Sequence, residues 1–376
     1  MRIGIDARMI SMGGIGTYLK SLLAGLSRRD DDVEYVLFLQ EKDMDFCSGL
    51  GRNFRRVVCA ALPYSLAEQV TLPRLLGRER LELIHHPHYF APLFGKTPMV
   101  ATIHDLIHQL FPALCPSALH WRVSKWMIAR TARRARVILA VSEHTKKDIV
   151  EHLGVPDEKI RVTHNALPPG WEEALAPRPE VLERLGDAPY FLYVGNHKRH
   201  KNLQLLLDAF TDLLKEVDGV RLVMTGERES LDGVLRFLDL GEEVVFLGQM
   251  PQEALPGIYR PAQALVFPSH YEGFGYPPLE AMACGVPPIV SDAAALPEVV
   301  GDAGLIVPRG DKDALRNAML RILREPGLRN ALAEKSKERA RFFHWEKLAA
   351  ETQRAYRDAL SCSPGRISAS SSVSRP

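Results

Sequence analysis

Short apolar runs alternate with segments of helical spacing along most of the chain, and this alternation predicts the fold class. Helical spacing lies between several of the runs, for example in Ile15–Leu26 and Thr145–Leu153. Such alternation is typical of a mostly parallel sheet with helices on both faces. The strands predicted in the first half are Arg2–Asp6, Tyr35–Gln40, Val57–Ala60, Leu83–His86, Met99–Ile103, Val137–Ser142 and Arg161–His164.

A proline-rich connection interrupts this pattern near the middle of the chain. Pro168–Gly170 and Ala176–Pro179 indicate an interdomain linker. The alternation then restarts, with helical spacing in Leu203–Leu214 and Lys312–Leu323. We therefore predict two doubly wound α/β domains with a ligand site in their cleft, because open α/β sheets bind ligands at the carboxyl ends of strands. The strands predicted in the second half are Tyr190–Val194, Val220–Thr225, Val244–Leu247, Ala264–Pro268 and Pro288–Ser291.

Composition and charge exclude several other classes of protein. A net charge of +2 gives no indication of a nucleic-acid partner. Five cysteines, an odd number without a Cys-x-x-Cys pair, argue against a disulfide framework or a zinc site and indicate a reducing compartment. The N-terminus enters a strand directly, and no apolar stretch is long enough to span a bilayer. We expect a cytoplasmic protein, or one that is peripheral on the inner face of the membrane.

The segment Ser269–Pro288 carries the most informative candidate chemistry. It places Glu272 in a glycine-containing loop and Glu280 in a helix that is expected to begin near Pro277 or Pro278. A helix N-terminus favours a phosphate group, and carboxylates accept hydrogen bonds from hydroxyls. The combination suits a ligand that is part diphosphate and part sugar. On spacing alone, the equal alternative is an ordinary loop with Glu280 as a solvated helix residue.

This segment resembles the E-x7-E signature of the retaining glycosyltransferases of family 4, which have the GT-B fold. The matching stretches are Glu-Gly-Phe-Gly, Leu-Glu-Ala-Met-Ala and Cys-Gly-Val-Pro, followed by Ser291 and Leu296–Glu298. The resemblance extends from the glycine-rich segment Met12–Thr17 to Glu298. It implies that Glu272 and the amides of Gly273–Gly275 hold the hydroxyls of the donor sugar and that Glu280 accepts from the ribose diol.

The resemblance also implies a division of the chain. Residues 1–175 would form a Rossmann-like acceptor domain, and residues 186–343 a Rossmann-like domain for the nucleotide-sugar donor. A helix at 344–360 would cross back to the first domain. The serine-rich tail, residues 361–376, is expected to be disordered because it has too little apolar surface to bury.

A second block, Tyr193–Leu203, places Lys198, Arg199 and Lys201 after a predicted strand. Three cations there can balance a diphosphate through charge-assisted hydrogen bonds, although a solvated basic turn is the alternative. The resemblance assigns phosphate binding to Lys201. Many family members have arginine where this chain has Asn196, so Lys198, Arg199 and His200 are all candidates for the second group on the leaving phosphate.

In the first half, His104 follows a predicted strand within the pattern Thr-x-His-Asp. A lone histidine after a strand is more often structural, but it can also donate to a sugar hydroxyl or orient an acceptor. The pattern resembles the first-domain histidine of the family that interacts with the transferred sugar. The other histidines nearby, His85, His86, His88 and His108, lack the carboxylate and spacing of a metal site, and the family needs no metal. We expect no metal and no cofactor besides the donor.

The glycine-rich segment Met12–Thr17 is predicted to be a loop before a helix, with amides of Gly13–Gly16 free for a ligand. A dinucleotide site is the alternative, but the glycines lack G-x-G-x-x-G spacing. In the family this loop lies beside the donor phosphates and sugar.

The segment His120–Arg136 is basic, contains two tryptophans and has no acidic residue. The simpler interpretation is a helix packed on the sheet by Trp126, Ile128 and Ala132, with a solvated basic face. The second interpretation is a helix that lies on an anionic membrane surface.

Together with these observations, the resemblance implies a retaining glycosyltransferase that moves a hexose from a nucleotide donor onto a glycan or lipid-linked acceptor in polysaccharide or lipopolysaccharide biosynthesis. The loop Gly-Asn-x-Lys-x-His-Lys-Asn resembles bacterial mannosyltransferases, which favours GDP-mannose. A UDP-sugar donor, a GT-B nucleotide-sugar epimerase and a non-catalytic sugar-nucleotide sensor are the alternatives. The residues expected to be catalytic are His104, Glu272 and Lys201, and those expected to bind the donor are Gly14, Gly16, Asn196, Lys198, Gly273, Phe274, Gly275 and Glu280.

Overall fold

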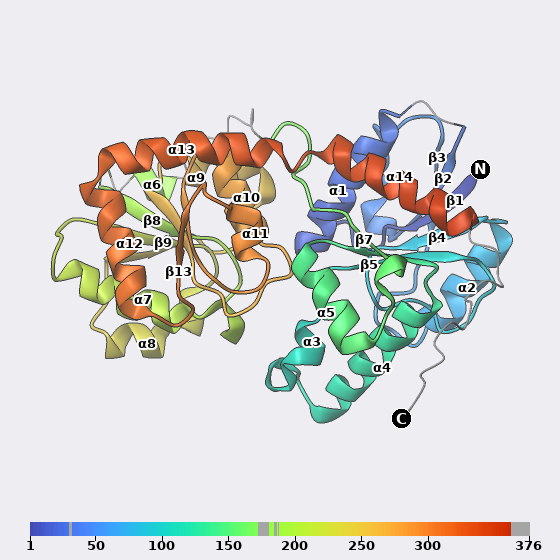
Figure 1. Cartoon of the computed structure of the whole chain (residues 1–376), viewed down its shortest axis with the longest axis horizontal. Helices are drawn as coiled ribbons and strands as arrows, with labels where there is room; N and C mark the ends of the chain where they lie inside the picture. The colour runs from blue at the N-terminus through green and yellow to red at the C-terminus, as the bar shows by residue number, and fades with distance from the viewer. Residues whose placement is uncertain (30–31, 172–179, 184–185, 187, 362–376) are drawn as a thin grey trace, which may run out of the picture.

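The computed structural model describes the chain except for residues 30–31, 172–179, 184–185, 187 and 362–376. Two parallel sheets, each covered by helices, form two domains that lie side by side (Figure 1). The linker residues Ala176–Pro179 lie outside the described residues, and so does the tail predicted to be disordered, 361–376, apart from Ser361, which is the last residue of the helix Trp345–Ser361.

The first sheet has seven strands in the order β3-β2-β1-β4-β5-β6-β7, with parallel pairing throughout. All seven strands predicted for this half are present. The order reverses between β1 and β4, which is where open α/β sheets form a ligand crevice. The strands are β1 (Arg2–Asp6), β2 (Glu34–Leu39), β3 (Phe54–Val58), β4 (Leu83–His86), β5 (Met99–Ile103), β6 (Val137–Ala140) and β7 (Ile160–Val162).

The second sheet has six parallel strands in the order β10-β9-β8-β11-β12-β13 and reverses between β8 and β11. The five predicted strands are present, but β13 was missed because its apolar run is only three residues long. The prediction of two Rossmann-like domains is confirmed. The strands are β8 (Tyr190–Tyr193), β9 (Arg221–Met224), β10 (Val244–Phe246), β11 (Ala264–Phe267), β12 (Pro288–Ser291) and β13 (Leu305–Val307).

The helices cover both faces of each sheet, and several begin at polar caps. Ser117, Ser142 and Asp311 each accept a hydrogen bond from the backbone N–H three residues later. The helices are α1 (Gly13–Ser27), α2 (Glu68–Arg78), α3 (Ile107–Leu110), α4 (Ala118–Arg134), α5 (Glu143–Leu153), α6 (Glu180–Glu183), α7 (Leu203–Leu214), α8 (Asp232–Phe237), α9 (Leu255–Tyr259), α10 (Tyr276–Ala283), α11 (Leu296–Val300), α12 (Lys312–Arg324), α13 (Pro326–Arg341) and α14 (Trp345–Ser361).

The last helix, α14, follows α13 from the second domain and lies against α1 of the first (Figure 1). The approach is close at Gly25, where an added Cβ would lie 2.5 Å from the Cβ of Ala349. Farther along the helix, the hydroxyl of Tyr356 is 2.8 Å from Nδ1 of the buried His85. Helix α14 is thereby part of the core of the first domain. Among the described helices, none combines the length and the hydropathy that crossing a bilayer requires.

Candidate active site at the domain junction

Two loops of the second domain bring together a lysine and a glutamate that were predicted from different parts of the sequence. They follow β8 and β11, which are neighbours at the switch point of the sheet. Nζ of Lys201 donates to Oε1 of Glu272 at 2.7 Å, and the two side chains are 12% and 13% exposed. The ammonium also lies 5.0 Å from the ring centre of Phe267. The site therefore contains a cation and a hydroxyl acceptor in direct contact.

The loop of Glu272 is docked against the first domain through Gly273. A Cβ at this position would lie 1.8 Å from the carbonyl oxygen of His104, so only glycine fits. The carbonyl oxygen of Gly273 accepts hydrogen bonds from Ser142 Oγ at 2.7 Å and Thr145 Oγ1 at 3.1 Å. The ends of β5 and β6 thus hold the donor-side loop in place.

His104 lies at this junction as a neutral imidazole. Its Nε2 is 2.9 Å from the carbonyl oxygen of Pro87, and a carbonyl can only accept, so the proton is on Nε2. Burial lowers the pKa of His104 to about 4. Of the two roles that we considered for this side chain, donation to a sugar hydroxyl would need a proton on Nδ1, whereas this geometry leaves Nδ1 as an acceptor. The edge of the Tyr18 ring packs against the imidazole, with the ring centres 5.1 Å apart.

The start of α10 differs from the helix N-terminus that we expected to bind phosphate. The helix begins at Tyr276, and its next two residues are Pro277 and Pro278, which have no N–H. Among the hydrogen bonds of the described residues, none is donated by the amides of Gly273–Gly275. The donors available to a ligand are therefore in the loop before the helix.

Phe274 and Gly275 in that loop have structural roles of their own. The ring of Phe274 is buried and packs edge-on against Phe343, with the ring centres 5.4 Å apart, so only its backbone can face a ligand. Gly275 has a φ of 105°, in the region that favours glycine, and terminates the loop as the residue before α10.

Glu280 is buried inside α10, so the interpretation as a solvated helix residue is wrong. The hydroxyl of Tyr259 donates to its Oε2 at 2.7 Å. Burial raises the pKa of Glu280 to about 7, because no cation offsets the loss of water.

The glycine-rich segment is the first turn of α1 rather than the predicted loop. The N–H of Gly16 donates to the carbonyl of Met12 at 2.9 Å, and a Cβ there would lie 2.4 Å from the carbonyl oxygen of Ile10. Glycine is therefore required at position 16 for packing, and its N–H is already used and cannot bind a sugar nucleotide. Gly14 is exposed, and a Cβ on it would lie 3.3 Å from the Tyr276 ring. This turn thus meets the second domain beside the start of α10.

The loop after β8 exposes two of its three cationic side chains. Lys198 and Arg199 are exposed and make no ion pair with a described residue. The side chain of Asn196 accepts from the N–H of Lys198 at 3.3 Å and so shapes the turn. Burial and the neighbouring Lys201 lower the pKa of His200 to about 4, which favours the neutral imidazole in the protein without a ligand.

Two acidic residues at the junction were missed by sequence reasoning. Burial raises the pKa of Asp105, and the charges of Glu272 and Lys201 reach it across the junction. Glu298 of α11 accepts from the N–H groups of Glu143 and His144 at the start of α5, at 2.9 and 3.2 Å. Both residues stood in patterns already noted, beside His104 and after Leu296. Their roles could not be inferred from the sequence because they depend on contacts with the other domain.

The comparisons with known proteins agree with this arrangement. The sequence model of "Glycosyl transferases group 1" matches residues 178–339, and that of "Glycosyltransferase Family 4" matches residues 12–170. The chain is 33% identical to O-antigen chain mannosyltransferase B of Escherichia coli over 288 residues, which cover 73% of this chain and 74% of that protein.

Solved structures with the same fold have lower sequence identity. Sucrose-phosphate synthase of Thermosynechococcus elongatus superposes with a TM-score of 0.78 and 21% identity, over 96% of this chain and 100% of that chain. Anabaena HepE in complex with UDP-glucose superposes with a TM-score of 0.75 and 17% identity, over 95% of this chain and 99% of that chain. At these identities the likeness establishes the fold alone.

Proposed function

This chain belongs to glycosyltransferase family 4 and is a hexosyltransferase of the GT-B fold, and from this premise we propose that it transfers mannose from GDP-mannose with retention of anomeric configuration. The observation that carries the proposal is the contact between Lys201 and Glu272 at the junction of the two domains. A diphosphate attracts the ammonium, and sugar hydroxyls donate to the carboxylate. A nucleotide-sugar can therefore take over both halves of this ion pair.

The donor would lie between α1, the Lys201 loop and the Glu272 loop. Lys201 and the exposed Lys198 would hold the diphosphate, together with the N–H groups at the start of α1 near Gly14. Glu272 and the amides of Gly273–Gly275 would hold the sugar. Glu280 would accept from the ribose once its proton is released. Asn196 would act through the shape of its turn.

The transfer step that we propose takes place on one face of the sugar. The bond between the anomeric carbon and the phosphate oxygen breaks, and a bond from the acceptor oxygen forms on the same face. The proton of the acceptor hydroxyl passes to the departing phosphate oxygen, so no carboxylate nucleophile is required. Lys201 stabilises the negative charge of that oxygen, and neutral His104 accepts from a sugar hydroxyl through Nδ1.

The sugar is assigned by similarity to the E. coli mannosyltransferase and by the loop that contains Lys201. The acceptor, by the same similarity, is a glycan or a lipid-linked sugar. A UDP-sugar donor is the second candidate, because HepE, with the same fold, binds UDP-glucose. We propose no metal for the transfer, since Lys201 and Lys198 would supply positive charge to the diphosphate.

Binding of GDP, UDP, GDP-mannose and UDP-glucose, measured by calorimetry, tests the donor. We expect GDP-mannose to bind best and to be hydrolysed slowly without an acceptor, with the α-anomer released first as seen by proton NMR. Preference for UDP would replace GDP-mannose with the second candidate. Formation of an epimer from the donor alone would contradict glycosyl transfer, and binding without any turnover would indicate a sensor.

A further inference from the structure

Helix α4 has an outward face that the proposed transfer reaction does not use. Leu119, Val123 and Trp126 are 70%, 45% and 51% exposed, and their spacing places them on one side of the helix. The simpler interpretation of the sequence packed Trp126 on the sheet with Ile128 and Ala132. Those two are buried, but Trp126 is not, so that interpretation is wrong for the tryptophan.

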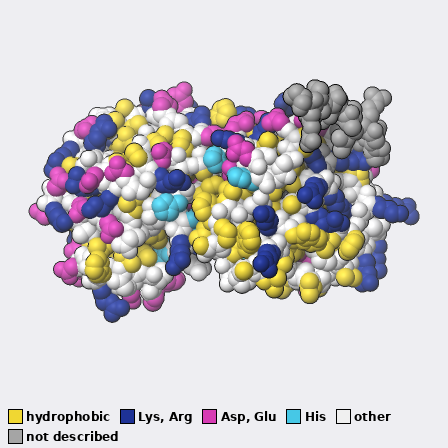
Figure 2. Space-filling model, turned by 60° about the horizontal axis from the view of Figure 1, so that its bottom comes forward, with side chains coloured by type: hydrophobic (Ala, Val, Ile, Leu, Met, Phe, Trp, Pro, Cys, Tyr) yellow, Lys and Arg dark blue, Asp and Glu magenta, His cyan; other side chains and the backbone are white. Residues whose placement is uncertain are grey.

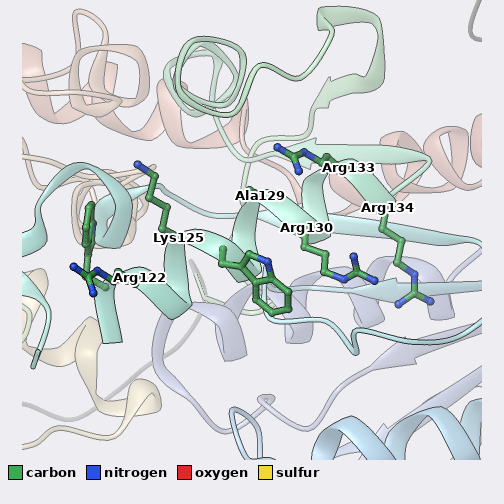
Figure 3. A pocket seen from close by; sticks show the side chains of 8 residues that line it. Arg122, Lys125, Ala129, Arg130, Arg133 and Arg134 are labelled. Atoms are coloured by element: carbon green, nitrogen blue, oxygen red, sulfur yellow. The ribbon is translucent and has the colours of Figure 1, made fainter. Parts of the chain in front are cut away.

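Basic side chains accompany these apolar ones along the whole helix, which contains no acidic residue. Together with two tryptophans they line an open hollow of about 700 Å³ (Figure 3). The ammonium of Lys125 lies 5.2 Å from the ring centre of Trp121, and the guanidinium of Arg130 lies 6.0 Å from that of Trp126. The lining residues with positive charge are Arg122, Lys125, Arg130, Arg133 and Arg134.

A neighbouring loop adds a further aromatic side chain. Arg130 donates to the carbonyl of Leu93 at 3.1 Å, and Arg134 donates to that of Gly95 at 2.9 Å. These bonds fix the loop beside α4 and leave Phe94 69% exposed. The exposed ring of Phe94 is thus carried by a loop whose backbone is fixed by hydrogen bonds to α4.

Further exposed apolar side chains lie next to this loop. The N–H of Leu93 donates to the side chain of Gln69 at 2.8 Å, which connects the loop to α2. Next to Gln69, Val70 is exposed, and Leu66 in the preceding turn is almost fully exposed. Figure 2 shows hydrophobic side chains interspersed with Lys and Arg on the first-domain half of this view.

We propose that this surface, the α4 face, docks the protein on a bilayer that contains anionic lipids. Exposed aromatic and aliphatic groups enter the boundary between headgroups and acyl chains, while lysines and arginines reach the lipid phosphates. A second copy of this chain fits less well, because it would bring two sets of like charges together. The inference does not depend on the identity of the donor.

Sedimentation with vesicles tests the proposal on the full-length protein. We expect binding to vesicles of phosphatidylcholine mixed with phosphatidylglycerol, weaker binding as salt is raised, and little binding to phosphatidylcholine alone. Replacing Arg122, Lys125 and Arg133 together with Gln should lower partitioning on the order of a hundredfold. Trp126→Ser combined with Phe94→Ser should lower it by about tenfold or more.

Matched controls lie on the second domain. Arg236, Arg324 and Arg341, replaced together with Gln, remove the same charge from exposed helix positions, and Phe237→Ser removes an aromatic side chain that is 85% exposed. Both controls should keep the binding of the unaltered protein. Equal losses in the controls, or no binding to anionic vesicles at all, would overturn the proposal. Self-association that Trp126→Ser abolishes, in a protein that ignores vesicles, would assign the α4 face to a second copy instead.

Donor binding serves as the measure of folding for every variant. None of these side chains touches Lys201 or Glu272, so the affinity for GDP and the thermal unfolding temperature should stay unchanged. A variant that loses vesicle binding and keeps both values has lost docking alone.

Discussion

The two ends of the segment between Glu272 and Glu280 carry the same functional group in opposite surroundings. Glu272 lies in a loop at the domain junction and is held by the ammonium of Lys201. Glu280 lies within α10 and accepts a hydrogen bond from the hydroxyl of Tyr259, and burial raises its pKa to about 7. One carboxylate is paired with a cation, whereas burial favours the protonated form of the other.

This difference separates what the two residues can do. A ligand that reaches Glu272 must replace an ammonium, so it needs both an anion for Lys201 and a hydroxyl for Glu272. A ligand that reaches Glu280 meets a group that gains or loses a proton near neutral pH. Changes at the first end should therefore act mainly on transfer, whereas changes at the second should act on the pH dependence of stability as well as on the proposed ribose contact.

The largest effect is expected from Glu272→Ala. Loss of the proposed sugar contact should lower kcat/KM by about three orders of magnitude, because the proposed role of this carboxylate is to position the reacting sugar. GDP affinity should stay the same or rise, since Lys201 no longer has to leave a carboxylate before it binds phosphate. Calorimetry and a transfer assay measure the two separately.

The control for this prediction is Glu242→Ala, an exposed glutamate of the same domain. It should leave both measurements unchanged. Full transfer activity in Glu272→Ala would remove the residue from the sugar site, and a collapse of GDP affinity would show that the two loops do not act separately.

A smaller effect is expected from Lys201→Ala. A charge-assisted contact to the diphosphate is lost, so GDP affinity should fall by roughly 10- to 100-fold. The variant Lys198→Ala, at an exposed position of the same turn, is the matched comparison and should cost much less. If Lys201→Ala binds GDP as well as the unaltered protein does, the ion pair is only structural.

The strands could be predicted from sequence because buried parallel strands are apolar runs. The loops that carry Lys201 and Glu272 could be placed after strands for the same reason. Their contact could not, because it depends on the sheet order that makes β8 and β11 neighbours. The role of Glu298 was hidden for a similar reason, since its partners are in the other domain.

Other differences arose from local rules that compete. Glycine disfavours helices, so Gly13–Gly16 was predicted to be a loop, but the close approach of Ile10 requires glycine at the start of α1. The lack of N–H groups in Pro277 and Pro278 could have been foreseen from the sequence. Trp126 was assigned to the core by its hydrophobicity, which cannot tell an apolar core face from an apolar outer face.

Glu280→Gln tests the second end of the segment. Between pH 4.5 and about 7 the unfolded chain loses a proton that the folded protein keeps, so the contribution of this group to stability falls as pH rises. Glutamine keeps the acceptor for Tyr259 and cannot ionise. The variant should therefore gain about 1–3 kcal/mol relative to the unaltered protein between roughly pH 5 and 8. Urea unfolding at about pH 5 and pH 8 measures this gain, with Glu242→Gln as the exposed control. If the difference in free energy of unfolding between the variant and the unaltered protein is the same at both pH values, the pKa of Glu280 is not raised by burial.

The smallest effect is expected from a substitution of Glu298, a third carboxylate, which is stabilised by hydrogen bonds. Hydrogen bonds from His164 and from two amides of α5 hold its pKa below the ordinary value although burial opposes this. Its contribution to stability is present above the ordinary pKa of glutamate and is lost as pH falls through the lowered value. Glu298→Gln should cost about 1 kcal/mol near neutral pH, as expected for the loss of a charge at a helix N-terminus.

Asp311→Asn is the matched control for Glu298→Gln, because Asp311 caps α12 within the second domain through a 2.9 Å bond from the N–H of Ala314. Both substitutions should lower the free energy of unfolding by a similar amount. Only Glu298→Gln breaks a cap that joins the domains, so only this variant should raise the KM for the donor, by a few-fold, and increase the radius of gyration in X-ray scattering. Equal effects of the two variants on KM would mean that the cap stabilises α5 without holding the domains together, and the junction would then depend on Gly273 and its partners.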